Sequence, residues 1–218
     1  MKEGKRLNSI PCYMFSKLDN LKNSLIEKGY DIIDLSVGDP DLPTPDFVIK
    51  ALQDGANDRR NHRYPPYKGT FEFRDAVAKY YKRRFDVCLD AESEVIALIG
   101  SKEGIAHLSL ALIDDKDAAL VPDPSYPVYK SSVSISGGCV YTMELKAQNS
   151  FLPDIENIDE ETAQKTKIMF LNYPNNPTGA VCTPDFYKKA VEFASKHGIA
   201  LVNDAAYNEI VFNEKPST

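Results

Sequence analysis

Four short loops hold the side chains of this sequence whose types and spacing could do chemistry. They are Gly-Ser-Lys-Glu-Gly at 100–104, Pro-Asp-Pro-Ser-Tyr-Pro at 122–127, Asn-Tyr-Pro-Asn-Asn-Pro-Thr-Gly at 172–179 and Asp-Ala-Ala-Tyr at 204–207. Each loop follows a short apolar run that has the length of a buried strand. Ligands of open α/β sheets bind beyond the carboxyl ends of the strands, so we interpret the four loops together.

The loop at 100–104 has the features of an anion site. Free backbone N–H groups at a helix N-terminus attract a phosphate. Gly100 lets such a group approach the backbone, and the hydroxyl of Ser101 is a further donor. The spacing is not that of a Walker loop. A plain helix cap explains the same residues, so both interpretations stay open at this point.

Two proline-containing loops present an aromatic ring and an amide. Tyr126, flanked by prolines, is placed to lie flat against a planar ligand, and Asn176 is placed to donate an N–H into a cleft. Ordinary turns, one of them with a core tyrosine, are the alternative. Because both loops must turn sharply at strand ends, we expect cis peptide bonds at Asp123–Pro124 and Asn176–Pro177.

Asp204 is the carboxylate of the set. It comes directly after an apolar run, where an ionised carboxylate needs a partner. A cationic ring nitrogen of a ligand is one such partner, and a helix N-cap is the alternative explanation, since Asp is common there. Four such loops in succession favour one shared site over four unrelated turns.

The elements that must position these loops alternate along the chain. We expect a polar surface connection at 146–166. Strands are expected at 32–37, 95–99, 118–121, 139–143, 167–171 and 199–203, and helices at 14–28, 46–57, 71–85, 101–113, 128–136 and 184–196. This alternation indicates an α/β fold with a mostly parallel sheet that is covered on both faces.

Composition excludes several classes of protein. The chain has 218 residues, a formal net charge of −6 and 43% hydrophobic residues, which is a globular composition. The negative charge argues against nucleic acid as a partner. The scattered cysteines and histidines have no metal-ligand spacing, so we expect no metal. No apolar run reaches membrane-spanning length, and we expect a cytoplasmic protein with no membrane partner.

Six motifs in family order resemble the class I/II aminotransferases, which are fold-type I enzymes that use pyridoxal 5′-phosphate (PLP). They are Gly-Asp-Pro-Asp at 38–41, Tyr64 with Gly69, and the four loops above. The amino-acid sequences of these motifs are most similar to those of bacterial LL-diaminopimelate aminotransferases, a group that serves lysine biosynthesis. The resemblance implies the α/β fold of PLP-dependent transferase fold type I, amino acid and 2-oxo acid substrates, and a homodimer.

The resemblance also implies how the candidate residues would hold the PLP ring. Asp204 resembles the carboxylate that keeps the pyridine nitrogen protonated, which makes the ring an electron sink. Tyr207 and Asn176 resemble the donors to its phenolate oxygen. Tyr126 resembles the aromatic residue that stacks on the ring face.

Four further residues have roles implied by the resemblance. Ser101 and Lys102 resemble the phosphate cradle at a helix start. Tyr64 resembles a residue that reaches the phosphate of the neighbouring subunit. Gly38 resembles the position where the backbone approaches the substrate carboxylate.

The sequence departs from the family pattern in one respect. The Schiff-base lysine, which follows the Asp-x-Ala-Tyr motif in a Ser-x-Ser-Lys segment, is not present in these 218 residues. We therefore expect an N-terminal portion, with 1–45 as an N-terminal arm and part of a small domain. Residues 46–218 are expected to be an incomplete PLP-binding large domain, truncated before that lysine.

The missing lysine bears on function. By itself the 218-residue chain is expected to be inactive, because it lacks the nucleophile and general base of the reaction. A non-catalytic PLP-fold binding or regulatory protein is the alternative. A plain nucleotide-binding module does not fit, because no G-x-G-x-x-G follows the first expected strand.

Overall fold

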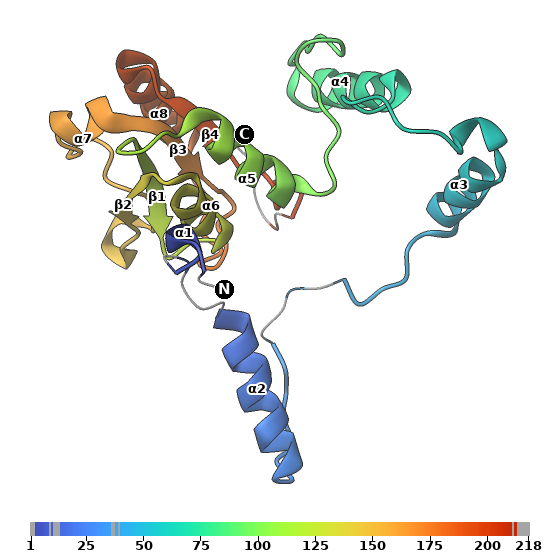
Figure 1. The fold of residues 1–218 in the computed structure, drawn as a ribbon, viewed down its shortest axis with the longest axis horizontal. Helices are drawn as coiled ribbons and strands as arrows, with labels where there is room; N and C mark the ends of the chain where they lie inside the picture. The colour runs from blue at the N-terminus through green and yellow to red at the C-terminus, as the bar shows by residue number, and fades with distance from the viewer. Residues whose placement is uncertain are drawn as a thin grey trace. The chain divides into compact units, whose positions relative to one another are not determined.

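The computed structural model of the chain describes residues 3–8, 10, 14–35, 38, 40–210 and 212 (Figure 1). It divides into two units. One unit is made of Met1–Pro11 and Leu98–Thr218, and the other of Cys12–Ala97. No helix among the described residues is long and apolar enough to cross a membrane. The division of the chain into an arm, a small domain and a large domain at residue 45 stays a prediction.

Four parallel strands form the framework of the first unit, in the order β2-β1-β3-β4. Their bounds are Ala118–Asp123 for β1, Cys139–Glu144 for β2, Thr166–Leu171 for β3 and Ala200–Asn203 for β4. This confirms the mostly parallel α/β sheet. After β1 the chain forms β2 on one side of it and then returns to form β3 on the other. That reversal beside β1 is where such sheets open a ligand crevice.

The helices of this unit begin and end where the sequence gives local reasons. They are α1 (Lys5–Asn8), α5 (Ser101–Leu112), α6 (Val128–Ser136), α7 (Glu160–Lys165) and α8 (Pro184–His197). The hydroxyl of Thr183 caps α8 by accepting from the Phe186 N–H at 3.3 Å. Gly198 ends that helix with a φ of 67°, in the left-handed region that glycine permits.

Alternate residues of the central strands build two cores, one on each face of the sheet. Leu120 and Met169 pack against α8 on one face, and Ile168 and Phe170 pack against α5 and α6 on the other. The helices contribute Phe186, Ala190 and Ala194 from α8, Ile105 from α5, and Tyr129 and Val133 from α6. The sheet is therefore covered on both faces, which fixes the positions of the strand ends.

The second unit contains helices and turns but no strand among its described residues. Its elements are α2 (Met14–Glu27), α3 (Asp46–Asn57), the 3₁₀ turn η1 (Arg59–Asn61) and α4 (Phe71–Phe85). The predicted N-cap Thr70 accepts from the Phe73 N–H at 3.4 Å. Arg74 of α4 is buried, and its guanidinium donates to the carbonyl of Ala91 and lies 3.2 Å from the Glu92 carboxylate.

Two predicted strands are wrong within the described residues. Residues 95–99 form no strand, and Ile96 and Ile99 are 58% and 92% exposed. Residues 32–35 form none either, while 36 and 37 lie outside the described residues. An apolar run supplies residues that suit a strand, but a strand also needs a partner for its ladder. The described residues provide no ladder partner for either run.

The segment 146–166 is more than the surface connection that the sequence predicts. It contains a 3₁₀ turn, η2 (Ala147–Asn149), and the helix α7. The Asp159 carboxylate caps α7 by accepting from the Thr162 N–H at 2.8 Å. Ile155 is buried in the core beside α8. The polar composition of the segment therefore indicates neither the capped helix α7 nor the core contact of Ile155.

Close packing beside β2 predicts the effect of one methyl group. A Cβ on Gly138 would lie 2.3 Å from Ile113 Cγ2 and 3.2 Å from the Asp117 carbonyl oxygen. We expect Gly138→Ala to lower the free energy of unfolding by about 1–3 kcal/mol, because overpacking forces neighbours to shift. A urea denaturation midpoint measures the loss. Gly4→Ala, where a Cβ would meet nothing within 4 Å, is the matched control. Equal midpoints for the two variants would contradict the close packing at Gly138.

Candidate functional site

Asp204 lies immediately beyond the end of β4. Its backbone N–H donates to the Leu171 carbonyl at 2.8 Å, which continues the pairing with β3 for one residue. Its carboxylate oxygen Oδ2 accepts a hydrogen bond from the phenol of Tyr129 at 2.8 Å. The described residues after it form a turn and no helix, so the N-cap alternative is wrong. The partner that a half-buried carboxylate needs is a tyrosine.

Tyr129 was not among the residues that the sequence singled out. Its side chain is fully buried in the first turn of α6, stacked on Phe170 with ring centroids 4.9 Å apart. Tyr126 meets it edge-on at 5.9 Å. Burial raises the pKa of the Tyr129 phenol well above its usual value, and the negative charge of Asp204 adds to the shift. The phenol therefore stays protonated and acts as a donor.

Asn172 connects the ends of β3 and β4. It is only 2% exposed, and its Nδ2 donates to the backbone carbonyl of Asp204 at 2.7 Å. Its Oδ1 accepts from the backbone N–H of Asn176, also at 2.7 Å. One buried amide thus fixes both the carboxylate-bearing residue and the loop that follows β3.

Asn176 and Tyr207 come from different loops and converge. The Asn176 Nδ2 donates to the Tyr207 hydroxyl oxygen at 3.3 Å. Both side chains are partly accessible at this edge of the sheet, and the Tyr207 O–H has its own proton to donate. Two neighbouring donors of this kind suit a single oxygen atom that carries negative charge.

The N-terminus of α5 presents backbone donors. Gly100 is its N-cap, with a φ of 80° and no side chain to accept from the first N–H groups, so Ser101 begins the helix and does not cap it. Glu103 turns back to accept from the Ile99 N–H at 2.6 Å. The Lys102 ammonium lies 5.3 Å from the centre of the Tyr126 ring. Backbone N–H groups and a cation here favour an anion.

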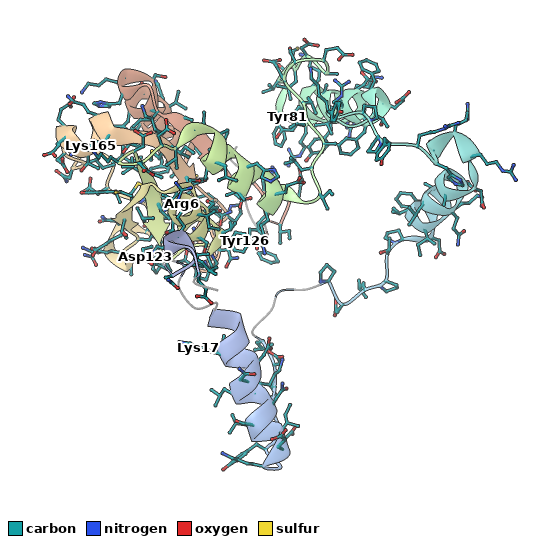
Figure 2. All side chains as sticks on the ribbon, viewed as in Figure 1. Arg6, Lys17, Tyr81, Asp123, Tyr126 and Lys165 are labelled. Atoms are coloured by element: carbon teal, nitrogen blue, oxygen red, sulfur yellow. The ribbon has the colours of Figure 1, made fainter. Side chains whose placement is uncertain are left out.

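A series of contacts connects five of the predicted residues of the first unit. Contacts run from Lys102 to Tyr126, through Tyr129 to Asp204, and through Asn172 to Asn176 and Tyr207. Figure 2 labels Tyr126 and Asp123 at the carboxyl end of β1. Ser101 is the neighbour of Lys102 on α5.

Two predicted site residues belong to the second unit. Tyr64 and Gly38 are both exposed there. Their roles toward a neighbouring subunit and a substrate carboxylate stay predictions.

The loops also confirm the backbone prediction. The peptide bonds Asp123–Pro124 and Asn176–Pro177 are cis, as the sequence predicted. Tyr173–Pro174 is cis as well, which was not predicted.

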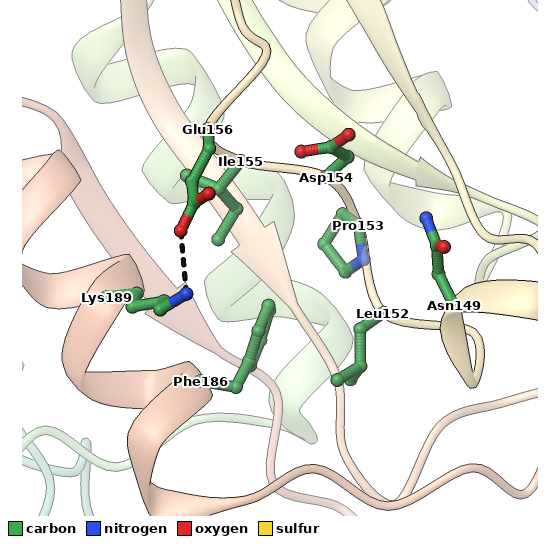
Figure 3. A pocket seen from close by; sticks show the side chains of 8 residues that line it. All are labelled: Asn149, Leu152, Pro153, Asp154, Ile155, Glu156, Phe186 and Lys189. Carbon is green, nitrogen blue, oxygen red and sulfur yellow. Dashed lines mark hydrogen bonds and ion pairs between the residues drawn. The ribbon is translucent and has the colours of Figure 1, made fainter.

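A separate pocket of about 330 Å³ lies between the 149–156 connection and α8 (Figure 3). The side chains of Leu152, Ile155 and Phe186 surround it. Three charged side chains line it: Lys189 Nζ lies 2.6 Å from Glu156 Oε1, and the Asp154 carboxylate accepts from Asn157 Nδ2 at 2.6 Å. None of the sequence-predicted site residues lines it. The candidate site is therefore the carboxyl edge of the sheet.

Comparison with known proteins identifies similar sequences. The family model described as aminotransferase class I and II matches residues 30–218. The LL-diaminopimelate aminotransferase of Aquifex aeolicus (strain VF5) is 51% identical over 212 residues, covering 97% of this chain and 55% of that relative. The enzyme of the same name from Syntrophobacter fumaroxidans is 50% identical over 210 residues, covering 96% of this chain and 54% of its own. The chain spans about half the length of these curated relatives.

Comparison with solved structures identifies the same fold. Substrate-bound BacF from Bacillus subtilis superposes with a TM-score of 0.93 and 38% identity, covering 100% of this chain and 55% of that one. A mutant of the Thermus thermophilus aspartate aminotransferase gives a TM-score of 0.91 at 26% identity, with 100% and 56% covered. The fold prediction of a fold-type I α/β architecture is confirmed over the half that the chain spans.

The buried amide of Asn172 leads to a prediction about stability, because its Nδ2 donor joins the ends of β3 and β4. In Asn172→Asp a buried carboxylate would face the Asp204 carbonyl oxygen in place of an N–H donor. We expect the free energy of unfolding to fall by roughly 3–5 kcal/mol at neutral pH, as for other uncompensated buried charges. The loss should shrink as the pH falls, because a protonated carboxyl can donate again. Chemical denaturation at several pH values measures both effects.

The matched control replaces an exposed asparagine in the same way. Asn149→Asp in η2 should change stability by less than about 0.5 kcal/mol. If Asn172→Asp were equally mild at neutral pH, Asn172 would not be the link between β3 and β4 that the structure shows.

Proposed function

This chain belongs to the class I and II aminotransferases, and from that premise we propose that it is part of a PLP-dependent transaminase that moves an amino group between an amino acid and a 2-oxo acid. The amino acid we propose is LL-diaminopimelate, because curated relatives at about half identity carry that name. The proposed protein has the relatives' length, and its Schiff-base lysine comes from a segment that follows these 218 residues.

The observation that carries the proposal is the linked set of side chains at the carboxyl edge of the sheet. PLP has a basic ring nitrogen, a phenolate oxygen, a planar ring and a phosphate. The chain has a carboxylate at Asp204, paired donors at Asn176 and Tyr207, an aromatic face at Tyr126 and an open helix N-terminus at Ser101. Each chemical feature of the cofactor therefore has a complementary group, and the residues fit it.

The residues have separate tasks in this proposal. Bound PLP supplies an electron sink for negative charge at the substrate Cα. Asp204 holds a proton on the ring nitrogen, because a nearby negative charge favours the cationic form. Asn176 and Tyr207 stabilise the charge on the phenolate oxygen by donation. The first turn of α5 holds the phosphate, with Lys102 as an added cation.

Further parts of the proposal concern partners and location. We propose a homodimer in which Tyr64 of one subunit reaches the phosphate in the other, and in which Gly38 lies against the substrate carboxylate. A reducing cytoplasm suits the cysteines Cys88, Cys139 and Cys182, which are all free thiols.

The central test is Asp204→Asn in a protein of the relatives' length. The amide keeps the shape of the side chain but no longer favours the protonated ring, so we expect kcat to fall by about 10²- to 10⁴-fold, given about 1.4 kcal/mol per unit of ring pKa. Steady-state transamination kinetics with LL-diaminopimelate and a panel of 2-oxo acids measure it. Asp185→Asn, at an exposed position in the first turn of α8, is the control and should be nearly silent.

Near wild-type turnover of Asp204→Asn would contradict the catalytic role of this carboxylate. A different result would correct only the substrate: the unsubstituted protein turns over another amino acid far faster than LL-diaminopimelate, while Asp204→Asn loses activity with both. The two results separate the mechanism from the specificity.

The 218-residue chain itself should not become covalently labelled. We expect that adding PLP, reducing with borohydride and mapping peptides will find no lysine modified stoichiometrically, because the family's lysine motif is not in this sequence. Mass spectrometry of the digest reads the result. Complete labelling of one lysine, together with transamination, would mean that a residue within this chain replaces the expected one.

A further inference from the structure

We propose that Tyr129 is the positioning residue that orients the Asp204 carboxylate toward the ring nitrogen of the cofactor. The inference rests on the proposed function and adds a residue that neither the sequence motifs nor the resemblance assigned. Tyr129 would act through Asp204 and would not touch the cofactor itself. Its hydroxyl occupies one carboxylate oxygen and thereby selects the other as the oxygen that faces the ligand.

The first support is that both backbone groups of Asp204 are hydrogen-bonded, whereas its carboxylate accepts only one hydrogen bond among the described residues. Its N–H is bonded to the Leu171 carbonyl, and its own carbonyl accepts from Asn172. The backbone is therefore fixed, while the carboxylate can still turn about its Cβ–Cγ bond. Among the described residues, only Tyr129 donates to this carboxylate, and it does so at Oδ2. Rotation of the carboxylate is limited by that one bond.

The second support is that the Tyr129 ring cannot follow a moving carboxylate. Its side chain has no exposed surface, and Phe170 lies parallel to it with an interplanar angle of 10°. Tyr126 closes another side of the ring with an edge-on contact at 86°. The phenol oxygen thus has a fixed position, and a fixed donor sets a fixed orientation for the acceptor.

The third support is that the group donating to the Asp204 carboxylate carries no charge. Within the part of the chain that the structure describes, Asp204 forms no ion pair with a lysine or arginine. A cation at this point would compete with the ring nitrogen for the negative charge, whereas a neutral phenol leaves that charge available. The charged and titratable side chains that act on Tyr129 are Asp204 and the phenols of Tyr126 and Tyr207. Asp204 is thereby oriented by a group that stays neutral.

The geometry also joins two cofactor contacts through one residue. Tyr126, proposed to stack on the ring, and Asp204, proposed to hold the ring nitrogen, both touch Tyr129. The position of the Tyr126 ring relative to the Asp204 carboxylate is then set by the Tyr129 side chain, which connects α6 with the end of β4. A purely structural tyrosine would fill the core without linking these two contacts.

The test uses Tyr129→Phe in a protein of the relatives' length, with Tyr173→Phe as the matched control. Tyr173 is also buried, and its phenol donates to the Phe151 carbonyl at 2.8 Å in the core beside α8. Both variants keep the ring and lose one buried O–H donor. The measurements are the dissociation constant of PLP by fluorescence titration of the apoprotein, kcat and KM, and the urea midpoint.

We expect Tyr129→Phe to weaken PLP binding by about tenfold and to lower kcat by roughly 10- to 100-fold, the range for hydrogen bonds to charged groups, with KM changed little. Tyr173→Phe should lower the urea midpoint to a similar degree and leave PLP affinity and kcat within about twofold. In an Asp204→Asn background, Tyr129→Phe should have almost no further effect on either quantity, because the two residues act as a unit.

The possible outcomes separate the inference about Tyr129 from the proposed function. Equal PLP affinity and kcat for Tyr129→Phe and Tyr173→Phe, with Asp204→Asn damaged, overturns the inference and leaves the proposed function intact. A full additional loss in the Asp204→Asn background also overturns it, because Tyr129 would then act by another route. If Asp204→Asn itself has wild-type PLP affinity and kcat, the proposed function fails and the inference fails with it.

Discussion

The hydrogen bond between the Tyr129 phenol and the Asp204 carboxylate is the interaction on which the rest of this site depends. A half-buried carboxylate at the end of a strand is unfavourable unless a donor compensates for the water that it loses. The 2.8 Å bond supplies that donor and also ties α6 to the end of β4. β4 lies at an edge of the described sheet, so backbone pairing holds it from the β3 side alone. Side chains from the helices must fix the remaining freedom.

Those side chains come from both faces of the sheet. Successive residues of a strand point to opposite faces, so Asn203 and Asp204 meet different helices. The Tyr187 phenol of α8 donates to Asn203 Oδ1 at 3.0 Å, and Tyr129 of α6 donates to Asp204. Burial raises the pKa of both phenols, which keeps both as donors. Asn172, directly after β3, also donates to the Asp204 carbonyl. Contacts from α6, α8 and the end of β3 therefore determine where the Asp204 carboxylate lies.

Sequence reasoning found the loops of the site but not the residues that hold them in place. The loops follow apolar runs and contain turn-forming residues, and both are local signals. Tyr129 and Asn172 matter through contacts with Asp204 across 75 and 32 positions of the chain, which no local pattern encodes. The available hints were modest. Tyr129 lies three residues after Tyr126, a spacing that brings side chains together at a helix start, and Asn172 opens one of the four loops.

The segment 95–99 shows the same limit for strands. Its apolar residues suit a strand, yet the partner that would complete a ladder is a tertiary property, and the described residues provide none. What the structure does specify is how the segment passes Gly69. A Cβ at that glycine, whose φ is 83°, would lie 2.4 Å from the Ala97 Cβ, while the Ala97 N–H donates to the Lys68 carbonyl at 3.0 Å. A motif glycine thus has a packing reason that is independent of any ligand, because only a residue without a side chain lets the two backbones approach so closely.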